Sequence, residues 1–204
     1  SDRHYKSREK LAWEFATILN QEAKELEAAG VDIIQFDEPS FNVFFDEVQD
    51  WGVATLERAA EGLRAETVVH ICYGYGIKAN TDWKATLGAE WRQYEQTFPL
   101  LQRSIIDTIS LESQHSHVPM DLIELVRGKN VMLGAIDVAS ETIETPDEVA
   151  DTLRNALKFV DADKLIPSTN CGMAPLPRDV ALGKLSALSA GADIIRKEIA
   201  AANP

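Results

Sequence analysis

The chain has 204 residues, with 20 Lys and Arg against 33 Asp and Glu, which gives a formal net charge of -13. This charge repels phosphate backbones and anionic lipids, so we expect neither a nucleic-acid partner nor a membrane partner. Hydrophobic residues make up 45% of the chain, and no apolar run approaches the roughly 20 residues of a membrane span. Two cysteines cannot form a disulfide framework, which favours a reduced, cytoplasmic protein.

The first predicted elements are a helix and a strand. Apolar residues recur at helical spacing over 11–26, with Ser7 available as an N-cap and Gly30 as a C-terminal stop. Residues 31–36 are mostly β-branched and apolar, which predicts a strand. Pro39 should end this strand, because proline has no N–H to donate to a ladder.

Strand and helix patterns then alternate along the rest of the chain. Further strands are predicted over 67–73, 107–112, 130–136 and 164–169. Further helices are predicted over 53–63, 91–105 with an interruption at Pro99, 120–126, 145–160 with a capping box at its start, and 178–200 with a break near Gly191. Five strand–helix units without hairpins predict an α/β fold with parallel pairing, in one domain that spans residues 1–204.

Polar residues gather at the carboxyl ends of the predicted strands, where parallel α/β proteins carry their chemistry. They are Asp37 and Glu38, His70 and Cys72, Glu112, Asp137, and Asn170 and Cys171. His70 and Cys72 are two residues apart on a strand, so their side chains point to the same face. With Cys171 and Glu112 they offer an imidazole, two thiolates and a carboxylate, a ligand set suited to zinc.

Each of these residues also has an ordinary structural interpretation. A buried cysteine is more often a small core hydrophobe than a metal ligand. His115 and His117, on a predicted loop, are competing ligand candidates. Asp37, Glu38 and Asp137 carry carboxylates that can instead solvate loops or cap helices. Spacing alone therefore leaves the metal site and the carboxylate roles open.

Four sequence blocks on the strand ends are informative together. They are residues 33–39 (Ile-Ile-Gln-Phe-Asp-Glu-Pro), 69–73 (Val-His-Ile-Cys-Tyr), 109–112 (Ile-Ser-Leu-Glu) and 170–172 (Asn-Cys-Gly). In this order and spacing they resemble the C-terminal catalytic barrel of cobalamin-independent methionine synthase. The resemblance implies a (β/α)8 barrel of the TIM type, of which this chain would hold the C-terminal five β/α units. It also implies that an incomplete barrel needs a missing N-terminal segment or a second copy in a homo-oligomer.

The resemblance further implies a methyltransferase that forms methionine by methylating the thiol of homocysteine. Its ligands to a Zn²⁺ cofactor would be His70, Cys72, Glu112 and Cys171. Homocysteine would bind the metal as a thiolate, in place of the harder ligand Glu112, and attack an electrophilic methyl group. Asp37 would pair with the substrate ammonium and orient it, which makes it the candidate catalytic residue.

Two further carboxylates, Glu38 and Asp137, are candidate substrate-binding residues. Residues 137–140 read Asp-Val-Ala-Ser where the family usually has Asp-Ile-His-Ser, and that histidine is thought to protonate the folate donor. Ala139 has no such proton, so a methylated corrinoid protein is an alternative to folate as methyl donor. Two other interpretations stay open: a related barrel methyltransferase for another thiol or a corrinoid carrier, and a metal-free degenerate barrel that acts as a binding module.

Overall fold

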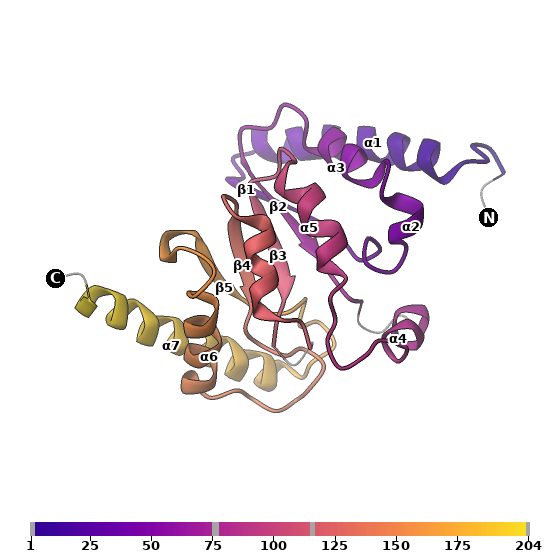
Figure 1. Cartoon of the computed structure of the whole chain (residues 1–204). Helices are drawn as coiled ribbons and strands as arrows, with labels where there is room; N and C mark the ends of the chain where they lie inside the picture. Colours follow the sequence, from indigo (N-terminus) through magenta and orange to yellow (C-terminus); the bar gives the residue numbers. More distant parts are fainter. Residues whose placement is uncertain (1–2, 75–77, 115–116, 203–204) are drawn as a thin grey trace.

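The computed structural model describes residues 3–74, 78–114 and 117–202. It contains a parallel sheet whose strands pair in chain order, β1-β2-β3-β4-β5 (Figure 1). The strands are β1 (Ile33–Glu38), β2 (Glu66–Ile71), β3 (Thr108–Glu112), β4 (Asn130–Gly134) and β5 (Leu165–Ser168). The predicted parallel pairing is therefore confirmed, with β1 and β5 as the two edges.

Helices follow the strands as the pattern predicts. They are α1 (Arg8–Ala28), α2 (Phe45–Val48), α3 (Gly52–Ala60), α4 (Lys78–Lys84), α5 (Tyr94–Gln102), α6 (Pro146–Ala156) and α7 (Arg178–Ala202), with 3-10 helices η1 (Met120–Val126) and η2 (Ala162–Lys164). Contacts link them in chain order: α1 with α3, α5 with η1, η1 with α6, and α6 with α7. Figure 1 shows α1 and α3 near β1 and α6 and α7 at the opposite end. No helix of the described residues combines the length and apolarity that a membrane span requires.

Local sequence signals place several helix ends. The side chain of Ser7 accepts the N–H of Lys10 and caps α1, and Gly30 follows the helix with φ +98°. Thr145 and Glu148 form a reciprocal capping box at the start of α6. These helix ends are where the sequence predicted them.

The structure differs from the prediction in two helices. Pro99 lies inside α5 without interrupting it, because the helix is held by buried side chains that include Phe98 and Leu101 on either side of the proline. Gly191 does not break α7, because it is buried where α7 packs against α6. The short helices α2 and α4 were not predicted, since neither is long enough to show a helical period.

The centre of the sheet is buried and its edges are not. Every residue of β3 is buried, and Leu111 is only 1% exposed. In β1, by contrast, Ile33 is 54% exposed, and β5 is half-buried along its length. Strands β2 and β3 are therefore covered, whereas β1 and β5, which each have a neighbour on one side only, keep exposed or half-buried residues.

Apolar side chains are also exposed on the helices at the two ends of the fold. They include Phe15 and Ile18 on α1 and Leu182 and Leu185 on α7. Helix α1 contacts α3 near β1, and α7 contacts β5. The unpaired strand edges and the exposed apolar helix faces therefore occur at the same two ends of the structure (Figure 1).

Candidate metal centre

Three of the four predicted ligands converge. His70 lies in β2, Cys72 directly follows that strand, and Cys171 follows β5. Their ligand atoms all lie within 4.8 Å of one another. Strands three positions apart in a flat sheet would be separated by about 14 Å. The convergence therefore requires a sheet that curves toward closure, as in a barrel.

The spacing of the two sulfurs fits a shared metal ion. The Sγ atoms of Cys72 and Cys171 are 3.7 Å apart, and both cysteines are free thiols. Two thiolates bound at about 2.3 Å in a tetrahedral zinc site lie about 3.8 Å from each other. A disulfide would instead bring the sulfurs to about 2.05 Å. The separation of the two sulfurs therefore matches that expected for two ligands of one ion.

The His70 ring is oriented for metal binding. Its Nδ1 lies 2.9 Å from the hydroxyl oxygen of Ser110, its partner in the β2–β3 register. Its Nε2 is buried and has no hydrogen-bond partner among the described residues. Leaving a buried polar atom unpaired costs about 1–3 kcal/mol. A metal ion at Nε2 would remove that cost, and metal-bound histidines commonly hydrogen-bond through the other ring nitrogen.

The thiols and the imidazole influence one another's protonation. Contacts with the Cys72 thiol and then with the His70 ring lower the pKa of the Cys171 thiol to about 4. The contact with Cys171, burial and the charge of Glu112 raise the pKa of the Cys72 thiol well above its usual range. Burial opposes protonation of His70, but interactions with Cys171 outweigh it and raise the pKa of the imidazole. These shifts favour ionisation of Cys171 over that of Cys72, and a dication would favour ionisation of both thiols.

Glu112 lies beside this group but outside it. Glu112 is 1% exposed, and its carboxylate accepts the backbone N–H of Tyr73 at 2.7 Å. Burial and then the charge of Glu112 raise the pKa of the Tyr73 phenol. The structure therefore places the predicted fourth ligand next to Cys72, with its carboxylate turned to the backbone of the following residue.

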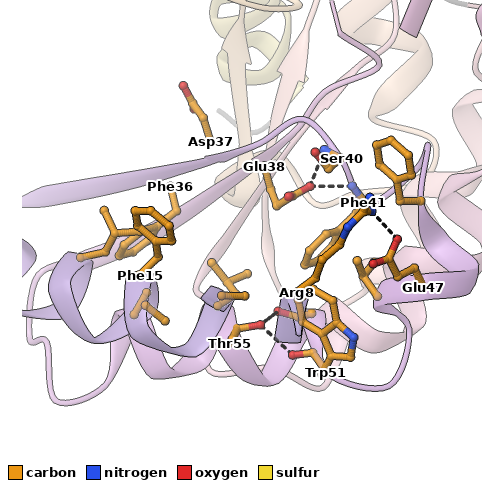
Figure 2. Close-up of a pocket in the computed structure, with 18 of the residues that line it drawn as sticks. Arg8, Phe15, Phe36, Asp37, Glu38, Ser40, Phe41, Glu47, Trp51 and Thr55 are labelled. Atoms are coloured by element: carbon orange, nitrogen blue, oxygen red, sulfur yellow. Dashed lines mark hydrogen bonds and ion pairs between the residues drawn. The ribbon is translucent and has the colours of Figure 1, made fainter. Parts of the chain in front are cut away.

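Asp37 lies on the same side of the sheet as the metal ligands. It pairs with His70 in the β1–β2 register and is exposed. The amide of Gln35 donates to its carboxylate at 2.8 Å. Figure 2 shows the Asp37 carboxylate pointing away from the side of β1 that Phe15 occupies. An exposed carboxylate beside His70 is available to a charged ligand.

Glu38 has a structural role in its own turn. Its carboxylate accepts the backbone N–H groups of Ser40 and Phe41 at 2.7 and 2.6 Å (Figure 2). Burial raises the pKa of this carboxyl group, against the lowering effect of the two N–H donors. Glu38 therefore stabilises the chain reversal after β1, as the structural alternative in the sequence suggested.

Asp137 is half-buried in the loop that follows β4. Its carboxylate accepts the backbone N–H of Ala139 at 2.8 Å. The preceding residue, Ile136, accepts the backbone N–H of Asn170 at 2.9 Å. Because Asn170 precedes the candidate ligand Cys171, the loop that carries Asp137 is hydrogen-bonded directly to the candidate metal centre.

Two further residues shape the site without having been assigned a role from the sequence. Ser110 orients His70, but its partner depends on strand register, which the sequence does not reveal. Asn170 is completely buried, and its side-chain oxygen accepts the backbone N–H groups of Ser113 and Gln114 at 3.2 Å each. It therefore holds the loop that follows Glu112. Its position in the Asn-Cys-Gly block was the only available signal.

Of the two competing histidines, only His117 lies within the described residues, and it is not part of the three-ligand group. His117 is exposed and its ring contacts Trp91, with 5.5 Å between the ring centroids. His115 lies outside the described residues.

One cavity is separate from the candidate metal ligands. It has a volume of about 610 Å³ and lies between α1, α3 and β1 (Figure 2). Apolar side chains such as Phe15, Phe36 and Trp51 dominate its lining, which includes neither His70 nor either cysteine. The cavity adjoins the open edge of the sheet, and we assign it no catalytic role.

Parallel β/α units with a cysteine–histidine cluster at the carboxyl end of the strands define a barrel protein with a candidate metal site. The family model described as "Cobalamin-independent synthase, Catalytic domain" matches residues 2–193. The chain belongs to this family, as its sequence blocks predicted, and its five parallel units agree with part of a TIM-type barrel.

Individual relatives agree with this assignment. The chain is 30% identical over 199 residues to a methionine synthase of Sulfurisphaera tokodaii, covering 97% of this chain and 53% of the relative. It is 31% identical over 200 residues to a methionine synthase of Saccharolobus islandicus, covering 97% and 54%. The chain therefore spans about half the length of the curated relatives it matches.

Solved structures show the same fold. A B12-independent methionine synthase from Shewanella sp. W3-18-1, in complex with selenomethionine, is 78% identical and superposes with a TM-score of 0.94, covering 98% of this chain and 59% of that one. A putative vitamin-B12-independent methionine synthase from Listeria monocytogenes is 20% identical with a TM-score of 0.64, covering 95% and 57%, and supports the fold alone.

Proposed function

We propose that this chain is part of a zinc-dependent methyltransferase that transfers a methyl group to the thiol of homocysteine and forms methionine. The observation that carries the proposal is the convergence of the ligand atoms of His70, Cys72 and Cys171 within 4.8 Å. The 78% identity to a B12-independent methionine synthase bound to selenomethionine supports a substrate of the same class. The two free thiols also support a reducing, cytoplasmic location.

The three converging residues would hold the zinc ion, and Glu112 is the proposed fourth ligand. When bound, zinc would stabilise the thiolate form of homocysteine near neutral pH and so supply the nucleophile. Ser110 holds the tautomer and orientation of His70 through Nδ1. The amide N–H of Gly74 donates to the sulfur of Cys72 at 3.0 Å, which favours its thiolate form.

Asp37 is the proposed partner of the homocysteine ammonium group. It is exposed, negatively charged and in register with His70, so a substrate whose sulfur lies at the metal can reach it with its amino group. Asp137 is proposed as a second substrate-binding residue from the neighbouring loop. Glu38 is the weakest of the three proposals, because both backbone donors of its turn already engage its carboxylate.

The residues of the loop after β4 are the basis for the proposed methyl donor. Ala139 is exposed there and has no side-chain proton to give. A methyl group on a folate nitrogen leaves readily only after that nitrogen is protonated, so general-acid catalysis is needed. Methyltetrahydrofolate is therefore expected to be a poor donor, and a methylated corrinoid protein is the proposed alternative.

The open ends of the fold are proposed to be covered in the active protein. Both strand edges are unpaired, and apolar side chains of α1 and α7 are exposed beside them. The relatives have about twice the length of the matched region. A preceding segment that completes the barrel, or a second copy of the chain, would bury these surfaces.

The test combines metal analysis with donor assays on the full-length protein. We expect about one zinc per chain by mass spectrometric metal analysis, lost in Cys171→Ser and retained in Ser189→Ala, an exposed α7 control. Homocysteine would be supplied with methylcobalamin or methyltetrahydrofolate, and methionine measured. A folded protein that binds no zinc would support a metal-free binding module instead. Methylation of another thiol but not of homocysteine would support the related-methyltransferase alternative.

A further inference from the structure

A buried charge in α7 contacts the loop that follows β4. Lys184 is 0% exposed, and its ammonium group donates to the carboxylate oxygens of Glu144 at 2.9 and 3.1 Å and to the carbonyl oxygen of Thr142. Glu144 is also buried, at 7% exposure. All three ammonium protons thus have acceptors from residues 142–144, as a buried cation requires.

Glu144 also contacts Asp137, a candidate substrate-binding residue. Its Oε1 accepts the backbone N–H of Asp137 at 2.8 Å. The carboxylate of Asp137 in turn accepts the N–H of Ala139. A continuous set of hydrogen bonds therefore runs from Lys184 in α7 through Glu144 to the backbone and side chain of Asp137.

The same segment of α7 also contacts the residue between Thr142 and Glu144. A Cβ added to Gly183 would lie 2.5 Å from Cδ1 of Ile143, closer than real Cβ contacts allow. The absence of a side chain at Gly183 therefore leaves the space that the end of the Ile143 side chain occupies. Gly183 and Lys184 are therefore the positions at which residues 142–144 pack against α7.

The other side of the Asp137 loop is bound to β5. Ala135 donates its backbone N–H to Ser168 at 2.8 Å, and Ile136 accepts from Asn170 at 2.9 Å. Asp137 thus lies between two sets of contacts. One set joins its loop to β5 and Asn170, and the other joins it to Lys184 through Glu144. Both sets of contacts hold the backbone that carries the Asp137 carboxylate.

We propose that Lys184 is a positioning residue, which acts through Glu144 to hold Asp137 in the geometry that binds homocysteine. This inference rests on the proposed function, because that function makes Asp137 a substrate contact. A buried ion pair with a purely structural role can often be replaced by uncharged residues of similar volume without loss. A positioning role predicts a specific loss of substrate affinity on the same replacement.

The experiment compares two charge-neutral double variants of the full-length, zinc-loaded protein. Lys184→Met with Glu144→Gln removes the buried pair, and Arg154→Met with Glu198→Gln removes the exposed pair that joins α6 to α7 without touching the loop. Homocysteine affinity would be measured by calorimetry. Amide hydrogen exchange would be followed at Asp137 and Ala139 in the absence of substrate.

We expect the Lys184/Glu144 variant to bind homocysteine at least tenfold more weakly and to exchange the Asp137 amide at least tenfold faster, with zinc content unchanged. The control should match the wild-type protein in all three measurements. If the Lys184/Glu144 variant does not fold, Glu144→Asp serves instead, because it keeps the charge but shortens the reach to the Asp137 amide. Affinity within threefold of the control in whichever variant folds would overturn the proposal.

Failure of the proposed function has a different signature. In that case the wild-type protein itself would not bind homocysteine. The exchange measurement still tests the positioning role, because it needs no substrate. Unchanged exchange at Asp137 in the folded Lys184/Glu144 variant would then overturn it.

Discussion

The centre and the ends of this fold differ in burial more than their sequences suggest. Strands β1 and β3 both mix apolar and polar residues and both end in a glutamate, yet β3 is completely buried while alternate residues of β1 are exposed. The candidate metal ligands show the same difference between centre and edge. His70 belongs to the buried β2, and Cys171 follows the half-buried edge strand β5.

This difference separates two requirements of the site. The imidazole is held by the centre of the sheet, through the β2–β3 register and Ser110. The second thiol depends on an edge strand, so its position needs extra support. Asn170, which ties the β5 end to the loops after β3 and β4, supplies part of that support. The site should therefore respond differently to changes at the centre and at the ends.

The largest effect on stability is expected in the centre. Leu111→Ala should lower the free energy of unfolding by about 2–5 kcal/mol, because it leaves a cavity at a position that is 1% exposed. Urea denaturation of the 204-residue chain would measure the loss. A loss below 1 kcal/mol would show that β3 repacks easily and that the centre is not the rigid part of the fold.

The next effect concerns the contact between the centre and the edge. In Gly134→Ala the new Cβ would lie 2.4 Å from Oδ1 and 2.7 Å from the Cα of Asn170. Relieving such a clash should cost about 1–3 kcal/mol and displace the Cys171 loop. The midpoint temperature of thermal denaturation and the zinc affinity should both fall. Gly88→Ala, where a Cβ meets nothing within 4 Å, is the matched control.

A smaller effect is expected from a change beside His70, the candidate ligand in the centre of the sheet. Ser110→Ala removes the hydrogen bond to Nδ1 of His70, and loss of such an outer partner typically costs about 10–100-fold in metal affinity. Competition with a chelator would measure the change. Thr108→Val, two residues earlier on the same face, removes a hydroxyl that donates to Glu66 and should leave zinc affinity unchanged. Equal effects in both variants would contradict the orienting role of Ser110.

The smallest effect is expected at the ends. Leu182→Ala should change the stability of the 204-residue chain by no more than about 0.5 kcal/mol, since Leu182 is 54% exposed. The same substitution in the full-length protein should cost about 2–5 kcal/mol if another segment buries this side chain. Equal, small effects in both proteins would argue against a covered α7 face. A large effect in the 204-residue chain alone would indicate association between copies.

Much of the fold and site could be predicted from the sequence. The strand–helix alternation, the capping box at Thr145 and the strand stop at Pro39 each depend on a few neighbouring residues. The ligand candidates His70 and Cys72 share a face by the two-residue period of a strand. Cys171 could be added because carboxyl ends of parallel strands meet at one edge.

Other features had no local signal. Lys184 occupies a buried position in α7, and only the tertiary structure shows that Glu144, 40 residues earlier, neutralises it. The orientation of the Glu112 carboxylate toward the Tyr73 amide, and the structural use of Glu38, depend on backbone groups whose direction the sequence does not reveal. Pro99 stayed helical because the burial of its neighbours outweighed its local preference.

The sequence by itself determined the order of the elements, the chemical types at the strand ends and the family to which the chain belongs, because these depend on residue identity and short-range spacing. The tertiary structure decided which of those residues meet. Curvature of the sheet brings the sulfur after β2 to within 3.7 Å of the sulfur after β5, although 99 residues separate them in the chain. Strand register selects Ser110 as the partner of His70. These outcomes follow from packing across the whole molecule, which no local pattern encodes.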